Sequence, residues 1–495
     1  MLKRTRSFLV LVMLLMTVTM SAQVTTATMS GKVTAQDEPI IGATIVAIHE
    51  PSGTRYGTVT NVSGQFNLQG MRTGGPYKVE ISYVGYQTAI YKGINLLLGE
   101  NYVLNVSLKE SSELLDEVVV TASKESNMKS DRAGAIMNAN RDMISNTPTI
   151  SRSISDIMRL SPQGADVGNG FAVGGGNYRQ SFVTVDGAAF NNTFGLGGNL
   201  PANGSPISLD ALEQVTVAVT PFDVRQSGFT GGAINAVTRS GDNQFRGTAY
   251  MYFNNENLKG SKVDDYELLR SKAQYYTYGA SFGGPIIKDK LFFFVNGEYE
   301  DNVTAGSNYR PRTALGESYS GGNIHRPLQS DMDDMRGFLL NKYNFDPGKY
   351  NDYSTDTPAY RVMARVDWNA NQNNKVRFRF TKTHTKDSNF PTSSVSPLST
   401  SALYPGGTST EVIDGKPVGT IAPGQGRTSK YALSFSNSNY YQVRDFTSVA
   451  GEWNSRMAQG AMNNMLRFAY SYQDEPRSFD GPLFPTVDIL QDGAV

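Results

Sequence analysis

The run Gly231-Gly232-Ala233-Ile234-Asn235-Ala236-Val237-Thr238-Arg239-Ser240-Gly241 decides the fold of the middle of this chain. It closes a unit that also contains a short helical turn at residues 207–213 and the strand Gln214-Val215-Thr216-Val217. Short apolar and β-branched runs favour strands, and glycines mark the turns between them. Residues 153–160 carry the apolar stripe of a short helix. We therefore predict a domain of mixed α and β structure over residues 132–240.

A glycine-rich segment at residues 168–176 of this domain invites comparison with a phosphate-binding loop. A dinucleotide-binding loop needs a strand before it and a helix after it. Here a strand follows, at residues 180–187, and the segment contains no Lys-Ser or Lys-Thr pair. The sequence therefore gives no support to a nucleotide site.

Downstream of residue 245, apolar and charged residues alternate with a period of two, as in Val376-Arg377-Phe378-Arg379-Phe380-Thr381. A strand of a membrane barrel would turn one such face to lipid and the other to a polar lumen. A soluble sandwich would also alternate, so the pattern alone leaves both folds open. The predicted lipid face holds Val362, Val366, Trp368, Val376, Phe378, Phe380, Leu466, Phe468 and Tyr470. The predicted lumen face holds Arg361, Arg365, Asp367, Arg377, Arg379 and Arg467.

Connection lengths favour the barrel. The turns at residues 284–291, 369–374 and 456–463 are short, whereas the connections at 255–271, 301–358 and 386–439 are long and polar. Short turns on one side and long loops on the other are typical of an outer-membrane barrel. Loops of this length are uncommon in a compact soluble domain.

The count of barrel strands is incomplete. About seven strands follow residue 245, and bacterial single-chain barrels normally have an even number. An open sheet edge is not tolerated in lipid. We therefore expect this chain to be the N-terminal part of a longer protein, with residues 245–495 forming a partial transmembrane β-barrel.

Composition agrees with a mainly β protein. The chain has 495 residues, enough for several domains, with 49 Gly, 24 Phe and 26 Tyr and only 18% charged residues. Lys and Arg together number 45, as do Asp and Glu, so nothing indicates a nucleic-acid partner. There is no Cys, which excludes disulfides, a thiolate nucleophile and Cys-bound metal.

The first 22 residues have the pattern of a secretory signal peptide. Lys3, Arg4 and Arg6 precede an apolar run at residues 8–16, which is too short to span a membrane as a helix. Ser21 and Ala22 stand where a peptidase would cut, although Met20 fits that site poorly, so the cleavage position stays open.

Residues 29–109 read as a small β-sandwich, with alternating strands separated by turn residues. His49 is interpreted as a strand-end residue, because no second ligand is suitably spaced for a metal. The run Asp116-Glu117-Val118-Val119-Val120-Thr121-Ala122 follows, and its three valines favour a strand. That strand either completes the sandwich or pairs with the sheet edge of another protein.

Taken in order, these segments resemble the TonB-dependent outer-membrane receptors. In that family a "TonB box" strand precedes a plug ending in Gly-Gly-x-Ile-Asn-x-Val-Thr, and a large barrel follows. Residues 31–108, with the turn Thr60-Asn61-Val62-Ser63-Gly64-Gln65-Phe66, resemble the carboxypeptidase-regulatory-like domain. That domain, and the runs at 184–192 and 282–294, are similar to those of Oar-like members.

The resemblance implies a transporter in the outer membrane of a Gram-negative bacterium, with the N-terminal domains in the periplasm or the barrel lumen. Residues 116–122 would be the TonB box, and residues 132–240 the plug that blocks the lumen. The partners would be TonB with its inner-membrane energising complex, outer-membrane lipid and an unidentified ligand, without a cofactor. Candidate ligand contacts are aromatic and amide residues in glycine-rich parts of the plug: Phe171, Tyr178, Phe190, Asn191, Asn192 and Phe194. The alternative is that these residues only fill the interface between plug and barrel.

Two rival functions remain to be weighed. A structural or adhesive outer-membrane protein would have a plug that never moves, and its 118–120 strand would belong to the sandwich. An enzyme is disfavoured because the three histidines are scattered and no Ser-elbow motif is present. Asp331, Asp333 and Asp334 resemble a calcium loop, but Met335 and Arg336 stand where a ligand and a Gly are needed, so we interpret them as a solvated loop face. No metal site is predicted.

Overall fold

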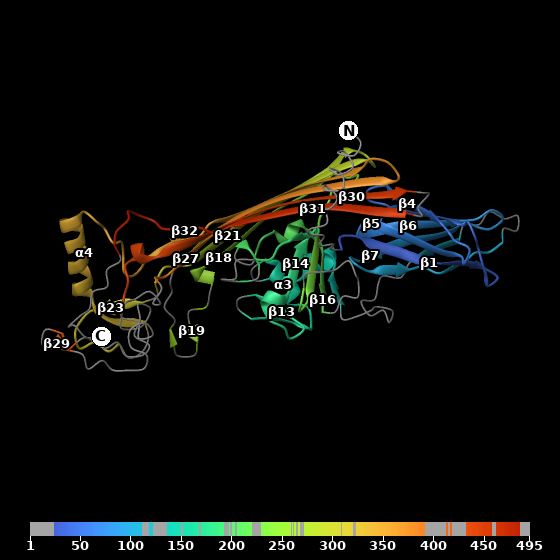
Figure 1. Ribbon diagram of the computed structural model, residues 1–495. Helices are drawn as coiled ribbons and strands as arrows, with labels where there is room; N and C mark the ends of the chain where they lie inside the picture. Colours follow the sequence, from blue (N-terminus) through green and yellow to red (C-terminus); the bar gives the residue numbers. More distant parts are fainter. Residues whose placement is uncertain are drawn as a thin grey trace, which may run out of the picture.

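The computed structural model has three β-rich domains. The sandwich lies at one end of a long sheet, and the plug lies beneath that sheet (Figure 1). It describes residues 24–485, with gaps at 111–117, 122–135, 150–151, 168–169, 193–197, 199, 203–204, 220–228, 259, 261, 264–265, 268–271, 308, 320–322, 392–411, 414–415, 418–431 and 458–461. The predicted signal peptide lies outside these residues. Within them, no helix is both long enough and apolar enough to cross a membrane.

Two sheets form the N-terminal sandwich. The first has the order β2-β1-β5, with β8 and β9 also paired to β1, and the second has the order β10-β7-β6-β3-β4. Alternate residues of both sheets point inward, so that Met29, Ile45, Leu68 and Tyr77 are fully buried between them. The strands are β1 (Ala27–Ala35), β2 (Glu38–Pro39), β3 (Thr44–His49), β4 (Thr54–Val59), β5 (Gln65–Met71), β6 (Gly74–Ser82), β7 (Ala89–Leu96), β8 (Asn101–Val103), β9 (Val106–Ser107) and β10 (Val118–Thr121).

The plug is a five-stranded mixed sheet with short helices, in the order β11-β16-β17-β14-β15. The run at residues 231–241 contains β17, whose six residues are all buried at the centre of this sheet. The predicted helix begins at Ser153, which forms a capping box with Asp156. The elements are β11 (Ile136–Ala139), α2 (Arg141–Asn146), α3 (Ile154–Met158), β12 (Gly164–Asp166), β13 (Phe171–Val173), η1 (Tyr178–Gln180), β14 (Phe182–Val185), β15 (Ala188–Ala189), η3 (Leu209–Ala211), β16 (Leu212–Ala218) and β17 (Ala233–Thr238).

Seven long antiparallel strands follow, and each pairs with the next one along the chain. They are β18 (Arg246–Asn255), β21 (Gln274–Ile287), β22 (Leu291–Ala305), β26 (Ala359–Asn369), β27 (Asn374–Asn389), β30 (Tyr440–Met457) and β31 (Met462–Asp474). The three predicted short turns join β21 to β22, β26 to β27 and β30 to β31. In the described part of the chain β18 and β31 end the sheet and do not pair with each other, so the sheet is open.

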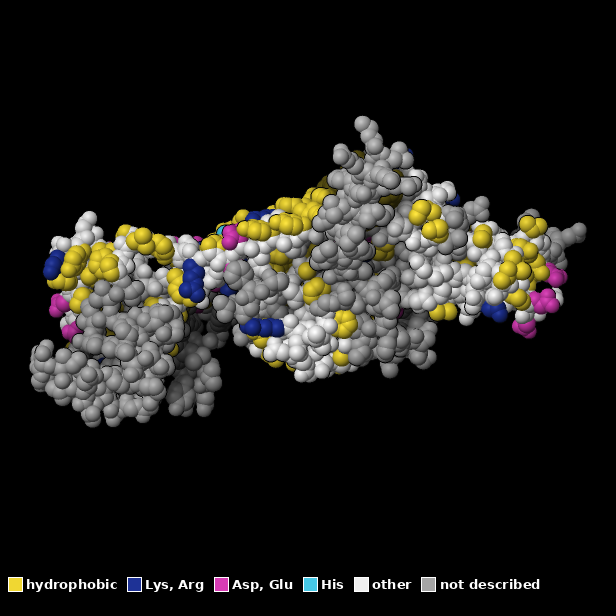
Figure 2. All heavy atoms as spheres, viewed as in Figure 1, with side chains coloured by type: hydrophobic (Ala, Val, Ile, Leu, Met, Phe, Trp, Pro, Cys, Tyr) yellow, Lys and Arg dark blue, Asp and Glu magenta, His cyan; other side chains and the backbone are white. Residues whose placement is uncertain are grey.

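The two faces of this sheet differ as the alternation predicts. Hydrophobic side chains gather along the outer face (Figure 2), where Phe378 and Trp368 are half exposed. On the inner face Arg361, Arg365 and Arg379 are at most 4% exposed, because the plug covers them. The mainly β architecture of sandwich, plug and barrel strands is therefore confirmed.

One expectation about the long connections is wrong. The connection at 301–358 is not a structureless loop, because it contains α4 (Gln329–Tyr343), β23 (Arg310–Arg312), β24 (Ile324–Leu328) and β25 (Ser354–Asp356). The three aspartates at 331–334 lie on α4 rather than on a loop, and Asp333 accepts a hydrogen bond from the Tyr350 hydroxyl at 2.6 Å. The remaining short elements are η4 (Glu256–Leu258), β19 (Lys262–Val263), β20 (Tyr266–Glu267), β28 (Val412–Ile413), β29 (Lys416–Pro417), η6 (Ser436–Ser438) and β32 (Arg477–Ser478).

Candidate functional site

The strand predicted to bind a partner lies at the edge of the sandwich. Its backbone pairs in parallel with β7, with Val118 opposite Ala89 and Thr121 opposite Lys92. The sequence left open whether this strand belongs to the sandwich or to a partner, and here it occupies the sandwich edge. Binding to TonB therefore stays a prediction, and Asp116, Glu117 and Ala122 lie outside the described residues.

Asp186 joins the plug to the barrel wall. It has a positive φ of 47°, and with Gly187 (φ 77°) it forms the two-residue turn between β14 and β15. Its carboxylate accepts hydrogen bonds from Thr238 of β17, from Oγ1 at 2.6 Å and from the backbone N at 3.1 Å. The same carboxylate pairs with Arg365 at 3.4 Å and with Arg379 at 3.3 Å, from β26 and β27. One turn of the plug therefore holds two barrel strands.

Buried arginines of the barrel wall bind both acids and plug carbonyls. Arg365 donates two hydrogen bonds of 2.8 Å to Asp367 and a third of 2.6 Å to the carbonyl of Thr238. Arg361 pairs with Glu298 at 3.0 Å and with Glu300 at 2.7 Å, and donates to the carbonyl of Ser205 at 2.6 Å. Removing one partner of such a pair leaves a costly unpaired charge, so these contacts fix the position of the plug.

Asp210 forms a second ionic contact near the end of the plug sheet. Arg141 contacts its carboxylate at 2.8 Å and Arg239 at 3.4 Å, and the Thr248 hydroxyl of β18 donates to it at 2.7 Å. Burial raises the pKa of Asp210, but hydrogen bonds from Arg141, Ser281 and Thr248 and the charge of Arg239 outweigh burial and leave the pKa below its ordinary value. The carboxylate therefore stays ionised between plug and barrel.

The described predicted ligand residues differ in exposure, and Phe171 and Phe190 belong to one buried apolar cluster. Phe171 and Phe190 are at most 1% exposed, and Phe190 packs edge to face on Phe446 of β30 at 4.7 Å between ring centroids. Asn191 is used within the plug, because its amide accepts from the Val183 N at 2.7 Å and donates to the Ser181 carbonyl at 2.8 Å.

The Phe190 ring therefore packs in the interface between plug and barrel in this conformation, whereas Phe171 is buried beside Gly164 of the plug. Tyr178 and Asn192 are partly exposed, and Phe194 lies outside the described residues. A ligand contact by any of the six residues remains a prediction.

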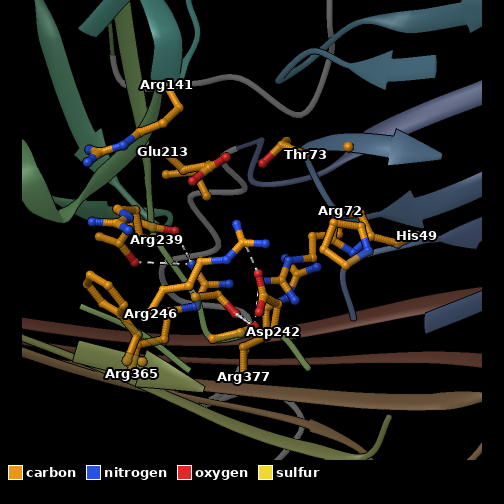
Figure 3. A pocket seen from close by; sticks show the side chains of 18 of the residues that line it. His49, Arg72, Thr73, Arg141, Glu213, Arg239, Asp242, Arg246, Arg365 and Arg377 are labelled. Atoms are coloured by element: carbon orange, nitrogen blue, oxygen red, sulfur yellow. Dashed lines mark hydrogen bonds and ion pairs between the residues drawn. The ribbon is translucent and has the colours of Figure 1, made fainter. Parts of the chain in front are cut away.

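A cavity of about 180 Å³ lies where the sandwich, the plug and the barrel meet (Figure 3). Six arginines line it: Arg72 from the sandwich, Arg141 and Arg239 from the plug, and Arg246, Arg365 and Arg377 from barrel strands. Asp242 lies among them and pairs with Arg246 at 3.5 Å, whereas Arg72 donates to the carbonyl of Gly241 at 3.1 Å. The sandwich therefore meets the other two domains through a polar junction. Among the described residues, no group of three or more His, Asp or Glu side chains could hold a metal ion.

Sequence reasoning placed Arg361, Arg365 and Arg379 on the inner face but missed Asp186, the plug partner of Arg365 and Arg379. A signal was present, because Asp186-Gly187 is a typical tight-turn pair directly after an apolar strand. Its pairing with strands about 180 residues further along the chain depends on tertiary structure. Asp210 and the arginine-lined junction were not singled out for the same reason.

Comparisons with known proteins agree with this architecture. Residues 28–109 match the family described as Carboxypeptidase regulatory-like domain, and residues 237–416 match the Outer membrane beta barrel domain. The TonB-dependent transporter Oar of Myxococcus xanthus is 27% identical over 256 residues, which cover 50% of this chain and 22% of Oar. The TonB-dependent receptor SusC of Bacteroides thetaiotaomicron is 29% identical over 269 residues, which cover 51% of this chain and 24% of SusC. The chain is homologous to the TonB-dependent outer-membrane receptors.

The chain thus spans less than a quarter of the length of these two TonB-dependent relatives. Among solved structures, the outer membrane transporter YddB of Escherichia coli is 11% identical with a TM-score of 0.44, and the match covers 68% of this chain and 38% of YddB. The ferric enterobactin receptor PfeA of Pseudomonas aeruginosa is 12% identical with a TM-score of 0.40, and the match covers 69% of this chain and 41% of PfeA. The barrel family and the two receptor relatives locate this receptor homologue in the outer membrane of a Gram-negative bacterium.

Proposed function

We propose that this protein carries out TonB-dependent active transport of a ligand across the outer membrane. The observation that carries the proposal is the plug itself, packed against the inner face of the barrel strands and preceded in the chain by a short β-prone strand. A plug that fills a barrel blocks diffusion, so transport requires it to move. The names of the two sequence relatives, a TonB-dependent transporter and a TonB-dependent receptor, support the same activity.

The proposed gate works through residues 116–122. A short extended segment can add to the edge of another protein's sheet, with main-chain hydrogen bonds supplying the affinity. TonB would hold this segment and pull on the plug through residues 122–135, with energy from the inner-membrane proton gradient. The polar contacts around Asp186 and Asp210 suit such a movement, because water can solvate these groups once the plug shifts.

The ligand is bound, in this proposal, at the plug apex and the connections between barrel strands. Tyr178, Asn192 and Phe194 are candidates in the resting plug, whereas Phe171, Phe190 and Asn191 become available only if the plug rearranges. The chain is proposed to be a transporter and not an enzyme, in keeping with its relatives.

A structural or adhesive outer-membrane protein is the second candidate, favoured by one observation. Residues Val118–Thr121 pair with β7, as they would if the strand served only the sandwich. In that case the plug would stay fixed and TonB would have no role.

Val119→Pro separates the two functions, because proline removes a backbone donor and obstructs strand pairing. We expect the full-length protein in detergent to be retained by immobilised TonB, and the proline variant to lose at least nine-tenths of this retention. Val119→Ile, which keeps the β-branched shape, should behave as the wild type. If TonB retains neither the wild type nor Val119→Ile, the transport proposal is wrong and the structural or adhesive function is favoured.

A further inference from the structure

The cavity at the junction of the three domains has more arginines than carboxylates in its wall. Of the residues that line it, six are arginines, and the two carboxylates are Asp242 and Glu213. Its volume of about 180 Å³ is far above the roughly 10–15 Å³ that a single water needs. The cavity can therefore hold a solute of several heavy atoms together with water.

The acids behind the cavity wall do not remove this excess of positive charge, because arginines share them. The Asp210 carboxylate pairs with Arg141 at 2.8 Å and with Arg239 at 3.4 Å. The Asp367 carboxylate likewise serves two arginines of neighbouring barrel strands, at 2.8 Å and 3.6 Å. One carboxylate carries one negative charge, so it compensates only one guanidinium of each pair.

The next carboxylates in the network are shared in the same way. Asp186 pairs with both Arg365 and Arg379, and Glu452 pairs with two more arginines. Among the described residues, the six lining arginines and two others on these acids therefore face the two lining carboxylates and four behind the wall. The cluster keeps a net positive charge.

Arg72 of the sandwich is the least compensated member of this cluster. In the described part of the chain no carboxylate lies within ion-pair distance of it, and its guanidinium donates to the Gly241 carbonyl at 3.1 Å. An arginine presents five N–H donors in a planar fork, so one carbonyl uses only part of this capacity. Burial, and after it the charge of Arg72, lower the pKa of His49, which also lines the cavity. The positive potential thus reaches a neighbouring side chain.

The lining arginines come from different domains and surround one space. Arg72 belongs to the sandwich, Arg141 and Arg239 to the plug, and Arg246 to the first residue of β18. In Figure 3, Arg72 and Arg239 lie on opposite sides of the view, with Arg246 and Asp242 between them. The Arg246 side chain is 60% exposed, so a small solute can reach the cavity from the surrounding solution.

We propose that this cavity binds a small tetrahedral oxyanion of the phosphate or sulfate type, which joins the sandwich to the plug and the barrel. Guanidinium groups bind phosphate oxygens through short, charge-assisted and often bidentate hydrogen bonds. A tetrahedral ion presents acceptor oxygens in several directions, which matches donors that arrive from three domains. The site is independent of TonB and of the transported ligand, so it goes beyond the proposed function.

Equilibrium dialysis of the full-length protein in detergent against labelled inorganic phosphate tests the site. Sodium chloride at about 0.15 M holds the ionic strength constant and screens exposed charges. We expect saturable binding of one phosphate per protein, with competition by sulfate but not by added chloride. Arg72→Gln and Arg141→Gln should each weaken binding at least tenfold. Neither variant strands Asp210, because this carboxylate keeps Arg239.

A matched control is Arg55→Gln. Arg55 is an exposed arginine of β4, in the same domain as Arg72, and it is not among the residues that line the cavity. The control removes the same charge from the sandwich, so phosphate binding should not change. A second measurement is amide hydrogen exchange at residues 72–73 and 239–243. Phosphate should slow this exchange in the wild type and in Arg55→Gln, but not in Arg72→Gln, because the ion joins these two segments.

Three results would overturn the proposal. The first is the absence of saturable phosphate binding at constant ionic strength. The second is an equal loss of binding in Arg72→Gln and Arg55→Gln, or displacement of phosphate by chloride, because either would mean general attraction to positive charge rather than a specific site. The third is saturable binding that leaves hydrogen exchange at both segments unchanged, which would contradict the joining of the domains.

Discussion

Asp186 shows how one residue can combine a local and a long-range role. Its backbone conformation suits the tight turn between β14 and β15, and its carboxylate reaches β17 and two barrel strands. The turn tolerates Asp or Asn equally, because both accept positive φ next to Gly. The second carboxylate oxygen and the charge, by contrast, serve Thr238 and the arginines.

Asp186→Asn should therefore keep the turn, lose the ionic contact and lose one of the two acceptors used by Thr238. Arg379 is 2% exposed, and in the described part of the chain its ion-pair partner is Asp186. Leaving such a charge uncompensated costs about 3–5 kcal/mol. We expect a loss of that order in the free energy of unfolding, measured by denaturation of the full-length protein in detergent.

The control for this variant is Asp346→Asn. Asp346 pairs with Arg336 at 3.0 Å, but both side chains are about half exposed. An exposed pair contributes about 0–1 kcal/mol, so this change should be small. Equal losses in the two variants would mean that the Asp186 contact does not hold the plug.

His49 makes the sandwich sensitive to acid. Its ring is 4% exposed, lies 2.7 Å from the Ser52 Oγ through Nδ1 and packs against Tyr77. Burial and the nearby charge of Arg72 lower the pKa of His49 well below 6.5. The unfolded chain therefore binds a proton below about pH 6.5 that the folded chain does not, so stability falls as the pH drops below that value.

The pH dependence can be isolated with His49→Gln. From pH 6.5 to 5.5 the wild type should lose up to about 1.4 kcal/mol more stability than the variant. Above pH 7.5 the difference between the two proteins should be constant. Parallel stability curves across the whole range would contradict a buried neutral His49.

At the scale of elements, the barrel strands were the most predictable part of the chain. Their period-two alternation and short turns are local signals, so the faces of β26 and β27 and the three tight connections follow from sequence. The capping box at Ser153 is local too. Each of these features needs only residues close together in the chain.

Other elements escaped sequence analysis because their signals are not local. Helix α4 has little apolar stripe, and Met332 is its one buried residue, so nothing in the run of 301–358 distinguished it from a loop. The place of β10 depends on a parallel pairing that its own residues do not specify. The burial of Phe171 and Phe190 likewise depends on the plug core and, for Phe190, on the barrel wall.

The outer face of β27 provides a test of the membrane assignment. Phe378 is 50% exposed, between Val376 and Phe380 on the same face. An arginine on the lipid face near mid-membrane costs about 2–4 kcal/mol. Phe378→Arg should therefore lower the folded fraction in the outer membrane, measured by heat-dependent mobility on gels.

A matched control comes from α4, where Leu340 is 46% exposed. This helix lies away from the barrel sheet, among the long connections (Figure 1), so Leu340→Arg should leave the folded fraction unchanged. If both variants assemble normally, the outer face of the sheet does not meet lipid.

At the scale of the whole molecule, the sandwich has a core of its own and meets the other domains through polar contacts, whereas the plug and the barrel strands share one apolar cluster. Leu98 of the sandwich donates from its backbone N to the Gln214 side chain of the plug at 2.8 Å. Thr25 contacts Glu452 and Arg467 of the barrel, and Asn369 donates to Thr54 at 2.9 Å. A separate core with a polar seam suits a domain that can shift relative to its neighbours, which here is the sandwich.

The central claim, that TonB energises this protein through residues 116–122, is tested most directly in living cells. A full-length protein carrying Val119→Cys as its only thiol is combined with TonB bearing single cysteines along its sheet edge. The account predicts a disulfide adduct at Val119 that is lost when the proton gradient is collapsed. The account is contradicted if the protein is folded in the outer membrane but forms no adduct at any position from Val118 to Thr121. In that case β10 would serve only as a strand of the sandwich.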